Sequence, residues 1–314
     1  MTTLYLVIPC YNEEGVIFDT ASRLLAKINA LTDAGIISEA SRILFIDDGS
    51  KDNTWEMIND LTQQDRHFAG AKLSRNQGHQ NALLAGLTIA KDRCDAAISM
   101  DADLQDDINA IDEMLFHFKN DCDIVYGVRS SRENDTNFKR YTAKTFYKLM
   151  RSLGADIVSD HADYRLMSRR ALEALMQYSE SNMFLRGIVP LLGYKSAIVS
   201  YKRGERFAGE SKYPLKRMLI FAFDGITSFS IRPIRIVTLL GSMIFAASLV
   251  ALIVLLILKL LGHTVQGWAT LMGSIWLLGG LQLLSIGIIG EYIGRVYHES
   301  KRRPRFFIEK LDIN

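Results

Sequence analysis

Two long apolar runs near the C-terminus restrict most strongly what this chain can fold into. Residues 236–258 and 268–290 contain no charged side chain. At a rise of 1.5 Å per residue, each run is long enough to cross a hydrocarbon core of about 30 Å. A buried helix hairpin of a soluble protein is the alternative, but such helices seldom stay uncharged over this length. The sequence therefore predicts two membrane-spanning helices.

The flanking charges predict how these two helices are oriented. Lys and Arg are enriched on the cytoplasmic side of membrane helices. Basic residues before the first run and after the second are Arg232, Arg235, Arg295, Lys301, Arg302, Arg303 and Arg305, whereas the connecting turn holds only Lys259 and His263. We therefore expect a multi-pass membrane protein with both termini in the cytosol.

The first 230 or so residues mix charged and apolar side chains as a soluble α/β protein does. The apolar stretch 4–9 is too short for a secretory signal and lacks a basic leader. Cys10, Cys94 and Cys122 have no paired spacing, which suits reduced thiols and excludes a disulfide framework. This N-terminal domain is therefore expected to remain in the cytosol.

Short apolar runs alternate with helix-like segments in this domain. The runs are "LYLVIP" from residue 4, "RILFIDD" from 42, "GAKLS" from 70 and "AAISM" from 96. A helix is expected over 14–31, with Leu24, Leu25, Ile28 and Leu31 as its apolar face. Strands alternating with amphipathic helices predict a parallel sheet covered on both faces.

Polar clusters follow three of these runs, namely "CYNEE", "DDGSKDNT" and "DADLQDD". Each alone could be a solvated turn, because Asp, Asn, Gly and Ser favour turns. In a parallel sheet, however, all three would meet at the carboxyl edge, where ligands bind. No GxGxxG or GxxxxGK phosphate loop accompanies them, so phosphate charge would have to be met by a cation or by side chains.

The third cluster has the donor atoms of a divalent cation site. If the segment is extended, Asp101, Asp103 and Gln105 share one face while Ala102 and Leu104 point back into the protein. Two carboxylates and an amide oxygen suit Mg²⁺ or Mn²⁺, which completes its shell with phosphates and water. We therefore expect a metal bound together with a diphosphate.

Eight segments, in order and spacing, resemble the inverting family 2 glycosyltransferases. They are "VIPCYNEE", "FIDDGSKDNT", "LSRNQGHQNALLAGL", "MDADLQDD", "DYRLMSRRAL", "RGERFAGESKY", "FDGITSFSIRPIRI" and "GIIGEYIGRVY". The resemblance is closest to bacterial membrane-anchored polyprenyl-phosphate glycosyltransferases, relatives of dolichol-phosphate mannose synthase. It implies a Rossmann-like GT-A nucleotide-sugar-binding domain, and a homo-oligomer, expected to be a tetramer. Gly287, Gly290 and Gly294 agree weakly with self-association.

The resemblance also assigns roles to individual residues. The nucleotide-binding positions are Pro9, Tyr11, Glu13, Asp47, Asp48, Gly78 and Asp101. The metal positions are Asp101, Asp103 and Gln105, and Asp103 is also expected to be catalytic. Asp107 departs from the Pro of many relatives, and we interpret it as a cap for a helix beginning near Ile108.

A lipid phosphate acceptor would need cations more than a base. Its second pKa of about 6 leaves it largely anionic at neutral pH. The basic residues considered for this role are Arg129, Arg132, Lys139, Arg140, Lys144, Arg203, Arg206 and Lys212. We select Arg129, Arg140, Arg206 and Lys212, with Arg129 also expected to be catalytic.

Asp163 is the other candidate catalytic residue. In "HADYRLM" it is read in a polar turn, where it could cap a helix or pair with Arg165. The resemblance implies a place near the acceptor, where it would orient or deprotonate the phosphate. His161 beside it is read as a loop histidine outside any zinc motif.

The expected organisation has four parts. Residues 1–213 form the cytosolic catalytic domain, 214–231 an amphipathic interface helix, 232–294 the transmembrane hairpin and 295–314 a basic cytosolic tail. Lys216 and Arg217 in the second part would face anionic headgroups.

The resulting hypothesis is transfer of one sugar, glucose or N-acetylglucosamine, from a nucleotide sugar to undecaprenyl phosphate at the inner leaflet of a bacterial cytoplasmic membrane. A uridine nucleotide is favoured by the resemblance, and no nucleic acid partner is expected. A processive polysaccharide synthase is disfavoured because Trp55, Trp268 and Trp276 are the only tryptophans and none lies in a Q/RxxRW motif. A non-catalytic membrane adaptor is the third alternative, and intact Asp101, Asp103 and Gln105 argue against it.

Overall fold

The four strands expected in the first hundred residues are present, and they belong to a larger sheet. The computed structural model describes residues 1–103, 105–129, 161–180, 185–202, 232–261 and 267–313. These residues fall into two compact units. The sheet unit comprises the described residues up to 202 together with 303–313, and the hairpin unit comprises those from 232 to 302.

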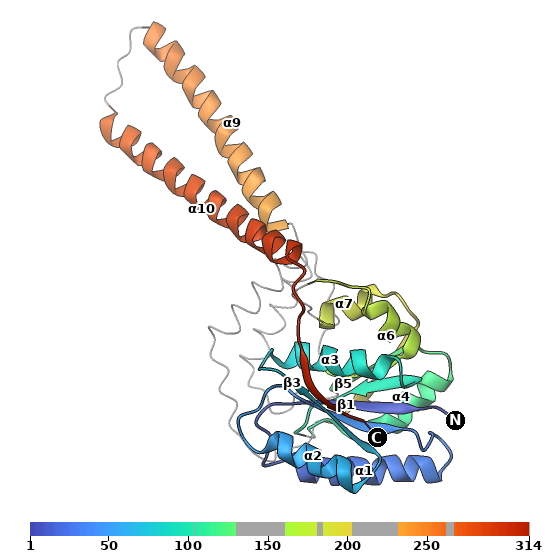
Figure 1. Cartoon of the computed structure of the whole chain (residues 1–314). Helices are drawn as coiled ribbons and strands as arrows, with labels where there is room; N and C mark the ends of the chain where they lie inside the picture. Colours follow the sequence, from blue (N-terminus) through green and yellow to red (C-terminus); the bar gives the residue numbers. More distant parts are fainter. Residues whose placement is uncertain (104, 130–160, 181–184, 203–231, 262–266, 314) are drawn as a thin grey trace. The chain divides into compact units, whose positions relative to one another are not determined.

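A β-sheet forms the centre of the sheet unit (Figure 1). It has eight strands, in the order β7-β5-β6-β4-β1-β2-β3-β8. The strands are β1 (Leu4–Cys10), β2 (Arg42–Asp47), β3 (Phe68–Leu73), β4 (Ala96–Ser99), β5 (Ile124–Arg129), β6 (His161–Ser168), β7 (Ser196–Tyr201) and β8 (Ile308–Asp312). β1 to β4 are parallel, as predicted. The expectation of a wholly parallel sheet is wrong, because β6 runs antiparallel to β4 and β5, and β8 runs antiparallel to β3.

β6 corrects two local expectations. Asp163 was expected in a polar turn and His161 in a loop, but both belong to this strand. The polar alternation of "ADYR" resembles a solvated segment. In β6, however, Arg165 is only 1% exposed and Asp163 6% exposed, so the polar residues are buried as a pair.

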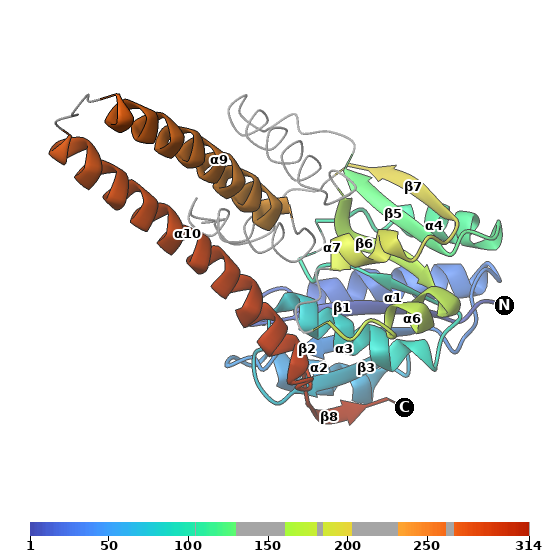
Figure 2. The same cartoon turned by 90° about the horizontal axis from the view of Figure 1, so that it is seen from above.

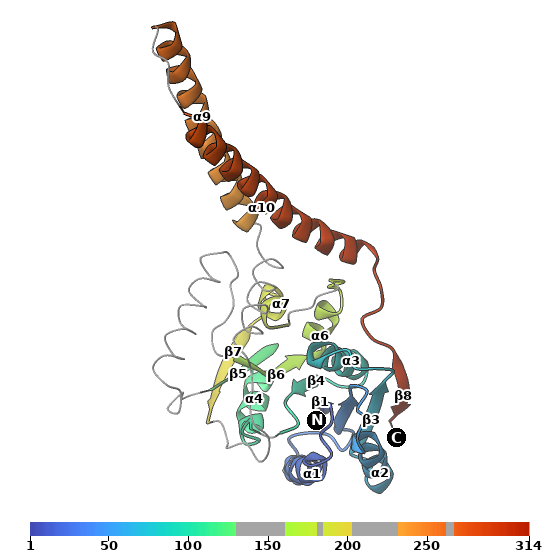
Figure 3. The same cartoon turned by 90° about the vertical axis from the view of Figure 1, so that its left-hand side faces the viewer.

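Helices cover both faces of the sheet (Figure 3). They are α1 (Ile17–Asp33), α2 (Thr54–Gln64), α3 (His79–Lys91), α4 (Ala110–Lys119), α6 (Arg169–Leu175) and α7 (Leu185–Leu191). α1, α2 and α4 share one core with Leu4, Leu6 and Ile8 of β1. α3 covers the opposite face, where a Cβ on Gly86 would lie 2.3 Å from Cγ1 of Val7. This glycine therefore permits the close approach of α3 to β1.

α1 confirms the helix expected over 14–31, displaced by a few residues. Leu24, Ile28 and Leu31 are buried, and Leu25 packs against the core. The helix begins at Ile17 because the carbonyl of Glu13 accepts hydrogen bonds from the next turn, at Val16 (3.0 Å) and Ile17 (3.1 Å).

β8 lies in the segment that was expected to be a basic tail. It pairs with β3 at the edge of the sheet (Figure 2). The hydroxyl of Thr62 in α2 donates to Oδ2 of Asp312 at 2.7 Å. The charged sequence "IEKLD" gives little strand signal, but an edge strand exposed on one face tolerates charge.

The hairpin unit contains two long helices, α9 (Arg232–Leu260) and α10 (Trp268–Ser300). They cover the two runs from which membrane spans were expected. Within the described residues, one helical segment is long and apolar enough to cross a membrane, Leu277–Gly294, with a mean hydropathy of 1.4. The expected interface helix over 214–231, with Lys216 and Arg217, lies outside the described residues.

Candidate active site

The loops that follow β1 and β2 lie side by side at the carboxyl edge of the sheet. Cys10 is the register partner of Asp47, so the two strands end together. The side-chain oxygen of Asn12 accepts a hydrogen bond from the amide of Lys51 at 2.9 Å, and the amide of Asn12 donates to Oγ of Ser50 at 3.0 Å. The first two polar clusters therefore converge, as expected for a parallel pair.

Pro9 and Tyr11 stand where β1 leaves the sheet. The pairing of β1 with β4 ends at Val7 and Ser99, so Pro9 lies beyond that ladder and its missing N–H disrupts no β4 bond. Tyr11 is 41% exposed and offers an aromatic face at this edge. The backbone of Glu13 is fixed by a 2.9 Å hydrogen bond from its amide to Oγ1 of Thr54.

Asp48 ties the second loop to the start of α3. Its two carboxylate oxygens accept hydrogen bonds from the amides of Gln77 (2.7 Å) and Gly78 (2.9 Å). Gly78 has φ +87°, a left-handed conformation that glycine adopts without strain. Burial raises the pKa of Asp48, although these two amides oppose the shift. Gly78, expected at the nucleotide site, thus lies against an expected nucleotide-binding carboxylate.

Asp47 is a buried carboxylate with one oxygen unused. Oδ1 accepts from the amide of Ser50 at 3.2 Å, whereas Oδ2 has no hydrogen-bond partner among the described residues. Burial raises the pKa of Asp47. This oxygen is therefore available to accept a hydrogen bond from a hydroxyl or an N–H group.

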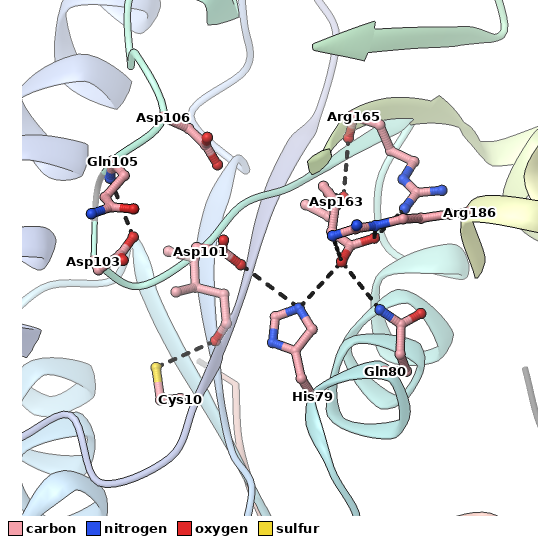
Figure 4. A network of polar contacts seen from close by, with 12 residues as sticks. Cys10, His79, Gln80, Asp101, Asp103, Gln105, Asp106, Asp163, Arg165 and Arg186 are labelled. Carbon is pink, nitrogen blue, oxygen red and sulfur yellow. Dashed lines mark hydrogen bonds and ion pairs between the residues drawn. The ribbon is translucent and has the colours of Figure 1, made fainter. Parts of the chain in front are cut away.

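The acidic motif after β4 turns instead of extending. Ala102 and Asp103 lie in a turn, so the expected alternation of an extended segment is wrong. Ala102 does point into the protein, at 4% exposed, and its carbonyl accepts a 2.6 Å hydrogen bond from Thr20 of α1. Oδ1 of Asp103 accepts from the amide of Gln105 at 3.3 Å (Figure 4). The turn thus keeps two of the proposed metal ligands together; Leu104 lies outside the described residues.

Negative charge is concentrated around Asp101. Desolvation raises the pKa of Asp101, and the nearby carboxylates of Asp106, Asp163 and Asp103 add to the rise. Nε2 of His79 lies 3.7 Å from Oδ1 of Asp101 and partly opposes it. A bound cation would relieve this repulsion.

The donor set at this motif determines whether a metal ion fits. Within the described part of the chain, no three His, Cys, Asp or Glu side chains are grouped as a metal site. A cation here would therefore use two carboxylates, an amide and oxygens from its ligand. That set fits Mg²⁺ or Mn²⁺ and does not fit zinc.

Asp163 is the centre of a buried ion-pair network (Figure 4). Its carboxylate lies 2.6 Å from Nη2 of Arg165 and 3.0 Å from Nη2 of Arg186, and Nε2 of Gln80 donates to it at 3.1 Å. Burial would raise the pKa of Asp163, but Arg165 and Arg186 outweigh burial and lower it well below its ordinary value. The predicted pair with Arg165 is confirmed. A carboxylate this firmly ionised is poorly suited to remove a proton.

Arg129 is held at the end of β5. Its register partner in β7 is Tyr201, whose hydroxyl oxygen accepts from Nε of Arg129 at 3.3 Å. Nη2 of Arg129 lies 3.5 Å from Oδ1 of Asp106, which also accepts a hydrogen bond from Tyr201. The guanidinium is therefore oriented before any ligand binds.

The remaining basic candidates lie outside the described residues: Arg132, Lys139, Arg140, Lys144, Arg203, Arg206 and Lys212.

Asp107 accepts from the amide of Asn109 at 2.9 Å, in the turn before α4. The expected cap is therefore wrong, because α4 begins at Ala110 with Asn109 as its N-cap residue and no side chain caps it.

Sequence reasoning missed several polar residues at this edge. His79, Gln80 and Asp106 lie in the quoted segments "NQGHQ" and "DLQDD", so their position beside expected site residues was a usable signal. Tyr201 and Arg186 had no such signal, because their contacts depend on the pairing of β7 and the packing of α7.

Comparisons with known proteins agree in two parts of the chain. The family model "Glycosyl transferase family 2" matches residues 5–176, and the model "GtrB C-terminal hairpin" matches residues 232–296. The first match runs from β1 to α6 and leaves out β7 and β8, and the second covers most of α9 and α10.

Full-length relatives carry related names. The chain is 56% identical over 306 residues to "Uncharacterized glycosyltransferase YkoT" of Bacillus subtilis (strain 168), covering 98% of this chain and 91% of the relative. It is 37% identical over 310 residues to "Prophage bactoprenol glucosyl transferase homolog" of Escherichia coli (strain K12), covering 98% of both. It is 38% identical over 308 residues to "Bactoprenol glucosyl transferase" of Shigella phage SfV, covering 97% of both.

Proposed function

The chain belongs to glycosyltransferase family 2, and we propose that it transfers one sugar from a nucleotide diphosphate sugar to a polyprenyl phosphate. The observation that carries this proposal is that two pairs of carboxylates follow β2 and β4, the parallel strands on either side of β1. Asp47 and Asp48 would contact the nucleoside. Asp101 and Asp103 would bind the metal ion that also binds the diphosphate.

The donor would bind across the ends of β1, β2 and β4. The free oxygen of Asp47 suits a ribose or base donor, and Tyr11 can stack on the base. Pro9, Glu13, Asp48 and Gly78 would shape the same pocket. We favour a uridine nucleotide carrying glucose or N-acetylglucosamine; the names of two relatives, which refer to glucosyl transfer, support glucose.

Asp101, Asp103 and Gln105 would hold Mg²⁺ or Mn²⁺. When bound, such an ion neutralises the diphosphate that leaves. The residues of the chain hold the nucleotide in place, and the crowding of carboxylates around Asp101 disfavours an anion there without a cation.

The acceptor would be undecaprenyl phosphate. Two relatives are named for bactoprenol, the same class of lipid. An anionic phosphate can attack without a strong base, which agrees with the firmly ionised Asp163. Arg129 would position this phosphate, together with Arg140, Arg206 and Lys212, and Asp163 would orient its surroundings. Attack from the face opposite the leaving diphosphate would invert the anomeric carbon.

The hairpin unit would anchor the enzyme in the bacterial cytoplasmic membrane, with both termini in the cytosol. The match to the GtrB hairpin model and the apolar segment Leu277–Gly294 support this placement. A tetramer is proposed on family resemblance alone.

The test of this function uses the purified full-length chain, radiolabelled nucleotide sugars, Mg²⁺ or Mn²⁺, and undecaprenyl phosphate. We expect label to enter the organic phase only when metal and lipid are both present. A panel of UDP- and GDP-sugars identifies the donor. A water-soluble labelled polymer, or no transfer from any donor, would overturn the proposal.

A further inference from the structure

Asp106 is a buried carboxylate to which the proposed reaction assigns no role. It is 2% exposed and lies in the same acidic motif as the proposed metal ligands. One oxygen, Oδ1, receives the hydroxyl of Tyr201 and faces Nη2 of Arg129 at 3.5 Å. The other, Oδ2, has no hydrogen-bond partner among the described residues.

The sheet itself brings the other two members of this group together. Arg129 and Tyr201 are register partners at the carboxyl ends of the parallel strands β5 and β7. Tyr201 accepts from Nε of Arg129 at 3.3 Å and donates to Asp106. Two neighbours therefore restrain one guanidinium, and both neighbours are set by rigid strands or by the acidic motif.

Packing fixes the ring of Tyr201. Tyr164 of β6 meets it edge to face, with ring centroids 5.2 Å apart and planes at 86°. The hydroxyl of Tyr164 donates to the backbone carbonyl of Asp107 at 3.0 Å, whereas that of Tyr201 donates to the carboxylate of Asp106. The two tyrosines are thus neighbours in one cluster with different hydrogen-bond partners.

We propose that Asp106 and Tyr201 are positioning residues, which hold Arg129 in the orientation that receives the phosphate of the lipid acceptor. This inference rests on the proposed function. A guanidinium restrained by two partners loses less freedom when it binds an oxyanion, so its hydrogen bonds contribute more to affinity.

Tyr201→Phe is the first test, because it removes one hydroxyl and keeps the ring. With the full-length chain and undecaprenyl phosphate, we expect the KM for lipid to rise about 10-fold, the equivalent of one charge-assisted hydrogen bond. The KM for the nucleotide sugar should stay unchanged. Asp106→Asn should raise the lipid KM in the same way.

Tyr164→Phe is the matched control. It removes a buried hydroxyl from the adjacent ring without removing a partner of Arg129, so the lipid KM should remain at the wild-type value. If Tyr164→Phe raises it as much as Tyr201→Phe does, the effect is one of general packing and the inference is overturned.

A double-mutant cycle isolates the role of Arg129. If Tyr201 acts through Arg129, Tyr201→Phe should raise the lipid KM little further when Arg129→Ala is already present. Equal effects in both backgrounds would overturn the inference while leaving the proposed function intact. A wild-type chain that transfers no sugar to the lipid would instead overturn the proposed function.

Discussion

The carboxylate of Asp163 lies 2.6 Å from the guanidinium of Arg165 two positions along the same strand, and both side chains are almost fully buried. Residues two apart in a strand point to the same face, so β6 itself places this pair together. Arg186 of α7 adds a second guanidinium. The sheet therefore contains a buried, ionised carboxylate that is held by two guanidinium groups next to the acidic motif.

Replacing Asp163 with Asn should cost about 3–5 kcal/mol of stability, because Arg165 would remain buried without its counter-charge. The pKa of Asp163 is lower in the folded state than in the unfolded state. The stabilisation from its ionised carboxylate is therefore complete above the unfolded-state pKa of about 4, and it declines as the pH falls from there towards the folded-state pKa. Denaturant unfolding of both full-length proteins between pH 3 and 7 measures this difference.

Asp112→Asn is the control for that experiment. Asp112 pairs with Lys27 at a similar distance, 2.7 Å, but is 53% exposed. Exposed pairs contribute about 0–1 kcal/mol. A loss in Asp163→Asn no larger than in this control would show that the network around Asp163 is not stabilising.

Asp103→Asn should abolish metal-dependent transfer and leave the fold intact. Loss of even an outer partner of a metal ligand commonly weakens metal binding about 10–100-fold, so loss of a direct ligand should weaken it at least as much. Mn²⁺ binding followed by electron paramagnetic resonance measures this without turnover. Asp107→Asn is the control, since the side chain of Asp107 binds Asn109. Normal Mn²⁺ binding in Asp103→Asn would contradict the assigned metal site.

Gly49→Ala should destabilise the loop after β2. Gly49 has φ +66°, and a Cβ there would lie 2.6 Å from the backbone of Arg75. A strained left-handed residue costs about 1–3 kcal/mol. The added methyl group should push the loop after β2 away from the loop before α3. This should disturb the amides bound to Asp48 and raise the KM for the nucleotide sugar. Thermal unfolding and donor kinetics measure the two effects.

Gly15→Ala serves as the comparison, because a Cβ on Gly15 would meet no atom within 4 Å and its φ is not positive. It should leave both quantities near wild type. If the two variants behave alike, the close approach at Gly49 does not shape the donor pocket.

Leu283→Arg should lower the fraction of the protein that stays in the membrane, because α10 is one of the two proposed spans. Leu283 is exposed within the apolar segment Leu277–Gly294. An Arg at the centre of a spanning helix costs about 2.5–3.5 kcal/mol on insertion scales. Alkaline extraction of membranes measures the retained fraction. Val296→Arg, beyond that segment, should remain membrane-bound, and equal retention of both variants would argue against the span.

The sequence predicted the elements whose patterns are local. The runs at 4, 42, 70 and 96 became parallel strands, and Leu24, Ile28 and Leu31 became the buried face of α1. The resemblance assigned Asp48 and Gly78 to one site, but only the structure showed why a glycine stands there, namely its φ of +87°.

The failures came from pairings between distant residues. β6 hides buried charges in a pattern that resembles a solvated turn, and only the counter-charge of Arg165 makes Asp163 compatible with a strand interior. The turn at Ala102 and Asp103 depends on Thr20, 82 residues away in sequence. Such contacts have no signature in local composition.

β8 pairs with a strand, β3, that is synthesised long before it. Its five residues are synthesised after both helices of the hairpin unit, so that edge of β3 stays unpaired until they have been made. A nascent chain stopped before Ile308 would retain that open edge, which is a template for pairing with another polypeptide. Pairing with β8 therefore covers an edge of the sheet that could otherwise associate with another polypeptide.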